Sequence, residues 1–242
     1  MLAHRVIPVL LKRGSTLIKG ERFDSWRSVG HALQAAKVHA ARSVDELMIL
    51  DVQASASAKG PDFFSVAELT EDCFCPLTVG GGVRGADDVR RLLAAGADKV
   101  AIGSAALKDP TVIRECASKF GSQAIVAIVD YDEDGNVKRH VSARSWAIEM
   151  AYWGAGEILL QAKWLDGTMR GYDLETIGAV ASSVSVPVIA CGGCSGYRDM
   201  AHAIQAGASA VAAGALFQFT DATPRGAAEY LAKAGIEARI PA

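Results

Sequence analysis

Two glycine-rich stretches each follow an apolar, β-branched run and precede a helical pattern. They are Pro76-Leu-Thr-Val-Gly-Gly-Gly-Val-Arg-Gly85 and Pro187-Val-Ile-Ala-Cys-Gly-Gly-Cys-Ser-Gly196. Glycine lets a backbone approach a ligand closely, and free N–H groups at the start of a helix favour an anion. One such stretch is more often a plain turn, but two of them predict phosphate-sized anion sites.

The two stretches keep one register. The pairs Pro76/Pro187, Gly82/Gly193 and Gly103/Gly214 are each 111 residues apart. The same offset relates the helix and the strand that follow each glycine turn. Two copies of a strand–turn–helix–strand–turn unit, about half a chain apart, predict a fold built from two similar halves.

The elements that position these turns alternate short apolar runs with amphipathic helical windows, as parallel strands and their covering helices do. Eight such units in 242 residues predict an α/β protein, a single (β/α)8 TIM barrel over residues 1–242 made of two similar half-barrels. The expected strands are Arg5–Leu11, Glu46–Asp51, Leu77–Val79, Lys99–Ile102, Gln123–Asp130, Glu157–Gln161, Pro187–Cys191 and Ala210–Ala213.

Composition narrows the class of protein. The net charge is −2 and half of the residues are apolar, which argues against a nucleic-acid or membrane-surface partner. We expect a cytoplasmic protein with no cofactor. The five cysteines and five histidines show no metal-ligand spacing, so no metal site is expected, and the C-x-x-C match at Cys191 and Cys194 is interpreted as structural.

Barrels of this kind carry their chemistry at the carboxyl ends of the strands. There the two halves would form two phosphate cradles on opposite sides of the mouth, which predicts a ligand with a phosphate at each end. Lys19, Asp51 and Asp130 reach the same face and are candidate catalytic residues; Asp51 either orients Lys19 or ends its strand. The candidate phosphate-binding residues are Gly82, Gly103, Ser104, Asp166, Gly167, Gly193, Gly214 and Ala215.

Motifs along the whole chain resemble those of the HisF family, the cyclase subunit of imidazole glycerol phosphate synthase. The resemblance implies a lyase-type barrel that takes ammonia from a glutaminase subunit docked at its amino-terminal face. It also implies that the ammonia cleaves and cyclises a doubly phosphorylated precursor. The motifs lie at residues 5–8, 45–51, 76–82, 96–100, 120–123, 154–160, 166–173 and 186–193.

The same resemblance assigns roles to charged residues at the amino ends of the strands. Arg5, Glu46, Lys99 and Glu157 match the ring of charges at the family's ammonia entrance, and Asp98 matches an acidic residue at the partner interface. The alternative is a buried ion cluster with a structural role only, because four charges in a narrow barrel must pair with one another.

The chain also departs from the family. Two aspartates act there as general acid and base, but here only Asp130 is present and Leu11 replaces its counterpart. The loop after Asp130 looks shortened, Trp164 and Leu165 precede Asp166 where polar residues are usual, and Gly103 replaces asparagine. With leucine at position 11, the chain resembles a paralogous branch of the family that is linked to surface-polysaccharide pathways.

Three hypotheses therefore remain. The first is an ammonia-using synthase barrel with altered substrate chemistry. The second is an authentic histidine-pathway cyclase that tolerates Leu11. The third is a non-catalytic subunit that activates a glutaminase and relays ammonia to another enzyme.

Overall fold

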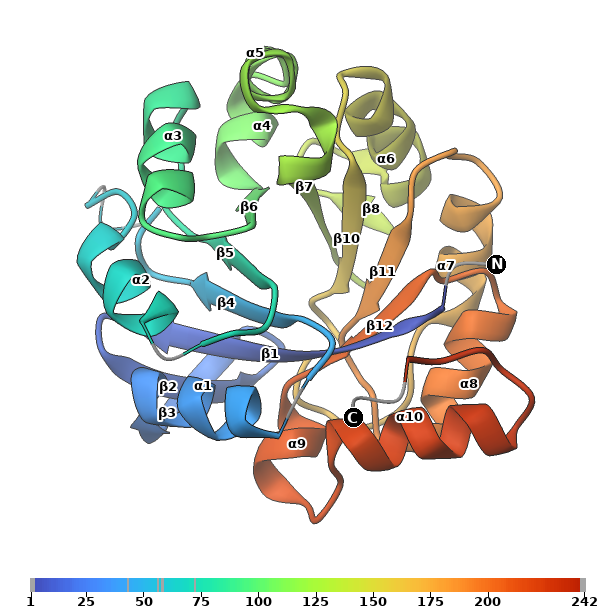
Figure 1. Cartoon of the computed structure of the whole chain (residues 1–242). Helices are drawn as coiled ribbons and strands as arrows, with labels where there is room; N and C mark the ends of the chain where they lie inside the picture. The colour runs from blue at the N-terminus through green and yellow to red at the C-terminus, as the bar shows by residue number, and fades with distance from the viewer. Residues whose placement is uncertain (1–2, 43, 56, 58, 72, 240–242) are drawn as a thin grey trace.

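Eight parallel strands close into a barrel in the part of the chain that the computed structural model describes, residues 3–42, 44–55, 57, 59–71 and 73–239. The closure is made by the last and first strands, with Arg5 opposite Ala210. The predicted (β/α)8 barrel is therefore confirmed (Figure 1). Its strands are β1 (Arg5–Arg13), β4 (Leu47–Asp51), β5 (Leu77–Gly80), β6 (Lys99–Ile102), β7 (Ile125–Tyr131), β10 (Glu157–Ala162), β11 (Val188–Cys191) and β12 (Ala210–Ala213).

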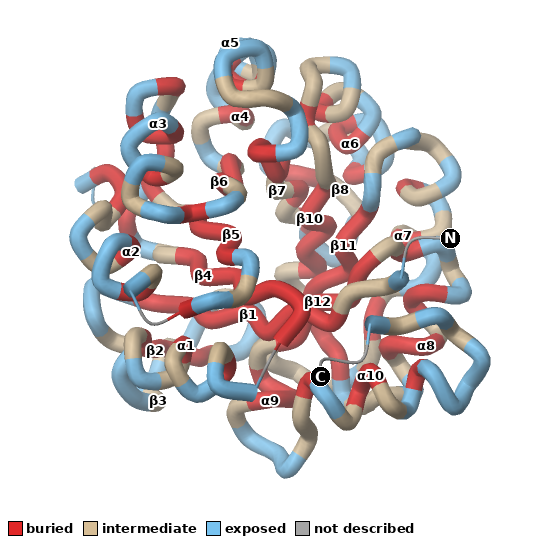
Figure 2. Tube along the Cα trace, viewed as in Figure 1, coloured by how far each residue is buried: buried red, intermediate tan, exposed pale blue. Residues whose placement is uncertain are grey.

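Helices surround this barrel. Their exposed sides face outward, and the strands that they enclose are buried (Figure 2). Gly96 ends α3: it follows the helix with a φ of +102°, and its N–H donates to the Leu93 carbonyl. The helices are α1 (Ala32–Ala41), α2 (Phe63–Thr70), α3 (Ala86–Ala94), α4 (Ser104–Lys108), α5 (Thr111–Phe120), α6 (Ala143–Tyr152), α7 (Leu174–Ala181), α8 (Tyr197–Gln205), α9 (Ala215–Phe219) and α10 (Pro224–Lys233).

Strict alternation along the strands creates two apolar layers. In β1, Ile7, Val9 and Leu11 belong to the cluster that fills the barrel, whereas Val6 and Leu10 belong to the layer beneath the helices. Successive side chains of a strand point to opposite faces, so residues two apart share a face. This parity places Arg5 and Leu11 on the same inward side, at opposite ends of one strand.

Two features differ from the predicted strands. The expected strand Gln123–Asp130 begins only at Ile125, because Ser122–Ala124 forms a 3-10 turn after Gly121. The first strand continues to Arg13, where Lys12 pairs antiparallel with Leu17 of an unpredicted hairpin, β2 (Thr16–Glu21) and β3 (Asp24–His31). β3 is largely exposed and polar, so it carries little of the alternation that marks a strand.

None of the described helices is both long enough and apolar enough to cross a membrane.

Candidate functional site

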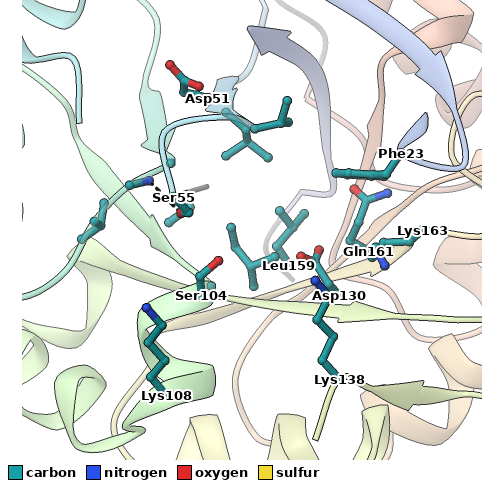
Figure 3. Close-up of a pocket in the computed structure, with 18 residues that line it drawn as sticks. Phe23, Asp51, Ser55, Ser104, Lys108, Asp130, Lys138, Leu159, Gln161 and Lys163 are labelled. Atoms are coloured by element: carbon teal, nitrogen blue, oxygen red, sulfur yellow. Dashed lines mark hydrogen bonds between the residues drawn. The ribbon is translucent and has the colours of Figure 1, made fainter. Parts of the chain in front are cut away.

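A cavity of about 440 Å³ opens at the carboxyl ends of the strands (Figure 3). It brings together five residues that the sequence predicted for this face: Asp51, Gly82, Gly103, Ser104 and Asp130. The remaining lining residues include the cations Lys108, Lys138 and Lys163 and the apolar side chains of Phe23, Leu50, Val52, Val83, Ala101, Ile128 and Leu159.

Asp130 supplies a carboxyl group suited to proton transfer. It is half-buried near the end of β7, and burial raises its pKa to about 6, against the lowering effect of Lys163 and Lys138. Figure 3 shows Lys138 and Asp130 on the same side of the cavity. A general acid or base works best when its pKa is near the operating pH, so Asp130 is poised for such a role.

Gln161 lies beside Asp130 and was not predicted as a site residue. The two residues are register partners on β10 and β7, and Gln161 is 3% exposed with its Nε2 atom lacking a hydrogen-bond partner among the described residues. Its inward position follows from the parity of Glu157 and Leu159 on the same strand. That parity was the signal that could have found it.

Asp51 stabilises its own loop. Its Oδ1 atom accepts hydrogen bonds from the backbone N–H groups of Gln53 and Ala54, each at 3.0 Å. The Lys19 ammonium instead donates to Asp166 Oδ2 at 2.5 Å. In this structure the counter-ion of Lys19 is therefore Asp166, on the loop after β10, and not Asp51.

The first glycine turn forms one wall of the large cavity and borders a second one. The adjoining cavity measures about 410 Å³ and shares Ser55, Gly82, Ser104 and Lys108 with the first. The N–H of Gly82 already donates to Ser55 Oγ at 3.2 Å. The Ser104 hydroxyl and Lys108 also line both cavities and are groups that bind anions, whereas the Gly82 N–H already has an acceptor.

The second glycine turn is more enclosed. Asp166, Gly167, Gly193, Gly214 and Ala215 surround a space of only about 10 Å³, which is near the size needed for one water molecule. The structure thus gathers the second predicted group of phosphate-binding residues in one place. The loops would have to open for a phosphate to enter this space.

At the opposite end of the barrel, four charges form a closed ring. Arg5 Nη1 lies 2.6 Å from Glu46 Oε2 and Arg5 Nη2 lies 3.1 Å from Glu157 Oε1. Lys99 Nζ completes the ring, at 3.0 Å from Glu46 and 3.1 Å from Glu157. Thr78 also donates to Glu46 at 2.6 Å. Positive and negative groups therefore alternate around the ring.

Electrostatics at the ring favour the charged forms. Burial alone would raise the pKa of Glu46, but Lys99 and Arg5 outweigh it and lower that pKa. Burial would likewise lower the pKa of Arg5, and the carboxylates of Glu157 and Glu46 raise it. The side chain of Glu46 is 2% exposed, so its ionised form depends on these partners.

Asp98 lies at the same end of the barrel. It is exposed, and its Oδ2 atom accepts a hydrogen bond of 2.8 Å from the N–H of Leu77 at the start of β5. This contact gives Asp98 a structural role in addition to the interface role that the sequence suggests.

Comparison with known proteins shows the family of the chain. The family model described as "Histidine biosynthesis protein" matches residues 5–223. The chain is 41% identical to the imidazole glycerol phosphate synthase subunit HisF of Hyphomonas neptunium, over 99% of both proteins. It is 45% identical to the subunit HisF of Streptomyces coelicolor, over 91% of this chain and 92% of that protein. The chain belongs to the HisF family.

The name of one further relative includes the word "putative". The putative imidazole glycerol phosphate synthase subunit hisF2 of Campylobacter jejuni is 37% identical, over 99% of this chain and 100% of that protein. HisF proteins with different names thus match this chain to similar degrees, and the overall identity does not separate them.

Leu11, the residue that the sequence analysis expects in place of a family aspartate, is buried. Leu11 is 3% exposed, packs in the cluster that fills the barrel and pairs in register with Leu50, which lines the large cavity. The cavity therefore has carboxyl groups at Asp51 and Asp130, and Leu11 adjoins its apolar wall at Leu50.

The segment after Asp130 is folded. It forms a two-stranded hairpin, β8 (Asn136–Val137) and β9 (Val141–Ser142), which leads directly into α6. The hairpin carries Lys138 to the rim of the cavity.

No three His, Cys, Asp or Glu side chains converge as a metal site among the residues that the structure describes.

Proposed function

We propose that this chain is a HisF-type subunit that receives ammonia from a glutaminase partner and uses it on a phosphorylated substrate, with chemistry altered by Leu11. The observation that carries the proposal is the pairing of two sites in one barrel. A ring of alternating charges lies at the amino ends of the strands, and a cavity with an acid of raised pKa lies at the carboxyl ends.

The route for ammonia would follow the inward faces of the strands. Glu157, Leu159 and Gln161 lie on the inward face of β10, in this order from the ring to the cavity, so one face of the strand connects the two sites. The interior between them is apolar. A neutral ammonia molecule crosses such an interior at far lower cost than an ammonium ion, so the ring would admit the neutral form.

The substrate would be held at the carboxyl end by its phosphate. Lys108, Lys138 and Lys163 make the cavity attractive to an anion, and the Ser104 hydroxyl adds a hydrogen bond. A second phosphate would require the enclosed space around Gly193 and Gly214 to open, with Asp166 exchanging its contact with Lys19.

The reaction would differ from that of a cyclase with two carboxylates. Leu11 cannot transfer protons, and Asp166 is tied to Lys19. Asp51 also lines the cavity, but its Oδ1 atom accepts from two backbone N–H groups of its own loop, so Asp130, with its raised pKa, is the carboxyl group best suited to acid–base chemistry. One positioned acid or base is typically worth about 10²–10⁴ in rate. We therefore expect the isolated chain to consume the histidine-pathway precursor at least about 10²-fold more slowly than a HisF with both aspartates.

The test is a direct rate measurement. The purified chain is given the phosphorylated precursor and ammonium chloride, and a two-aspartate HisF is the reference. A rate within about tenfold of the reference would contradict altered chemistry and would favour the histidine-pathway cyclase that the relatives' names indicate.

Partner docking is tested separately at Asp98. In a reconstituted pair, Asp98→Ala should lower partner-stimulated glutamine hydrolysis. Asp98→Asn is the matched control, because its side-chain oxygen can still accept from Leu77 while its charge is gone. Loss in both variants would locate the effect in the charge; loss in Asp98→Ala alone would reduce Asp98 to a structural role and count against the interface.

A second candidate is a non-catalytic subunit that activates a glutaminase and relays ammonia to another enzyme. Two observations favour it: Leu11 is buried, and the second group of glycines encloses only about 10 Å³. Failure of the chain to bind any phosphorylated ligand, combined with activation of a glutaminase, would select this candidate.

A further inference from the structure

A pair of cysteines lies at the amino-terminal end of the barrel, away from the cavity. Cys73 and Cys75 precede β5, and their Sγ atoms are 3.4 Å apart in a thiol–thiol hydrogen bond. Phe74, the residue between them, is 94% exposed. Asp98 is close enough to act on both sulfurs electrostatically.

We propose that Cys73 and Cys75 are a redox-active dithiol that closes to a disulfide by exchange with a small disulfide such as oxidised glutathione. The Cys73 thiolate attacks one sulfur of the oxidant, which forms a mixed disulfide and releases one thiolate. The Cys75 thiol gives its proton to that thiolate, and its sulfur then attacks Cys73 and displaces the second small thiolate, which takes a proton from water. Two protein thiols are oxidised and one small disulfide is reduced to two thiols.

Cys73 differs from the other cysteines in reactivity, because the hydrogen bond between the two thiols lowers the pKa of Cys73 and raises that of Cys75. The hydrogen bond from Cys75 lowers the pKa of Cys73 to about 7, whereas burial raises the pKa of Cys116 to about 11 and that of Cys194 to about 12. Burial also raises the pKa of Cys191. Only the thiolate attacks a disulfide, and its intrinsic nucleophilicity falls with pKa. Together these effects predict that Cys73 reacts about 10²-fold faster than Cys116 at pH 7.

The geometry also predicts a disulfide that is easily reduced. The two sulfurs must approach from 3.4 Å to a bond length of about 2.05 Å, which requires only a local adjustment. The closed loop holds a single intervening residue, so it constrains the unfolded chain little and gains little stability. Such disulfides have more oxidising potentials and are the labile ones in proteins.

Oxidation would act on the surface at which the glutaminase is proposed to dock. The cysteines adjoin Pro76, whose carbonyl accepts from Leu47 at 2.9 Å, and Leu77, whose N–H donates to Asp98 at 2.8 Å. Closing the disulfide would turn Phe74, whose ring is the most exposed large apolar group described here. This consequence for docking rests on the proposed function, whereas the disulfide itself does not.

The test equilibrates the folded wild-type chain in glutathione buffers of increasing oxidised fraction, followed by alkylation and peptide mass spectrometry. We expect Cys73 and Cys75 to be protected from alkylation as an internal disulfide while Cys116, Cys191 and Cys194 stay reduced. The Cys75→Ser variant should stop at a mixed disulfide with glutathione on Cys73. Cys116→Ser is the matched control and should behave as the wild type.

Two results would overturn the dithiol: no disulfide between Cys73 and Cys75 in any buffer in which circular dichroism shows a folded protein, or oxidation of Cys116, Cys191 and Cys194 before that pair. Docking is then measured with the reduced and oxidised wild type and a glutaminase. Equal binding by both forms would refute only the control of docking. Absence of binding by the reduced form would refute the proposed partner and leave the disulfide chemistry intact.

Discussion

The Nζ atom of Lys19 lies 2.5 Å from Oδ2 of Asp166, and both side chains are buried. The pair joins the β2–β3 hairpin to the loop after β10. A backbone hydrogen bond of 2.7 Å from Arg22 to the Asp166 carbonyl lies beside it. The hairpin is thus fastened across the mouth of the barrel, and any ligand that binds Lys19 or Asp166 must compete with this contact.

Removing one member of the Lys19–Asp166 pair should strongly destabilise the folded protein. Lys19→Met leaves a buried carboxylate without its partner, and we expect a loss of about 3–5 kcal/mol in the free energy of unfolding. The double variant Lys19→Met/Asp166→Leu should lose less than the two single variants together, with a coupling of about 2–3 kcal/mol measured in urea. Losses that simply add would show that the contact contributes nothing.

The ring at the amino end should be equally sensitive at its most buried member. Glu46→Gln keeps an acceptor for Thr78 but leaves Arg5 and Lys99 with only Glu157. We expect a loss of about 3–5 kcal/mol in unfolding free energy.

An exposed ion pair serves as the control for that measurement. Arg225 and Glu229 form a pair 3.1 Å apart with side chains 59% and 44% exposed, so Glu229→Gln should cost less than about 1 kcal/mol. Similar losses in the two variants would mean that the ring is screened by water and not a buried network.

Asp130 should make stability depend on pH in a particular direction. Its folded pKa of about 6 exceeds the ordinary value of 3.8, so the fold favours the protonated carboxyl. The resulting stabilisation of the folded state is at most about 3 kcal/mol. It is fully present below about pH 4 and is lost as the pH rises through 6.

Asp130→Asn removes this titration. Its free energy of unfolding should therefore increase relative to the wild type between pH 4 and pH 7, as measured by urea unfolding at both values. A difference between the two proteins that does not change with pH would show that the Asp130 carboxyl titrates normally.

Leu11 should be the position at which acid–base activity can be partly regained. Leu11→Asp puts a carboxyl group next to the cavity wall at Leu50, and we expect the ammonium-dependent rate to recover part of the about 10²–10⁴-fold deficit. Leu11→Asn is the matched control, because it is equally polar and similar in size but cannot transfer a proton. Equal rates in the two variants, measured as precursor consumption, would exclude Leu11 as the cause.

Local patterns in the sequence determined much of this protein. Alternation from Arg5 to Leu11, and again from Glu157 to Leu159, sets which side chains point into the barrel, because side-chain direction in a strand has a period of two. The repeat that relates Gly96 to Gly207 fixes the ends of two helices, since both glycines adopt positive φ. These are short-range constraints, and a sequence records them residue by residue.

The tertiary structure alone decided which groups meet. Lys19 had Asp51 and Asp166 as potential counter-ions, and the hairpin placed it on Asp166, 147 residues away. Gln161 became a neighbour of Asp130 through the pairing of β10 with β7. Such contacts depend on how the barrel closes and how its loops fold over the mouth. They are set by the packing of distant segments, which no local periodicity encodes.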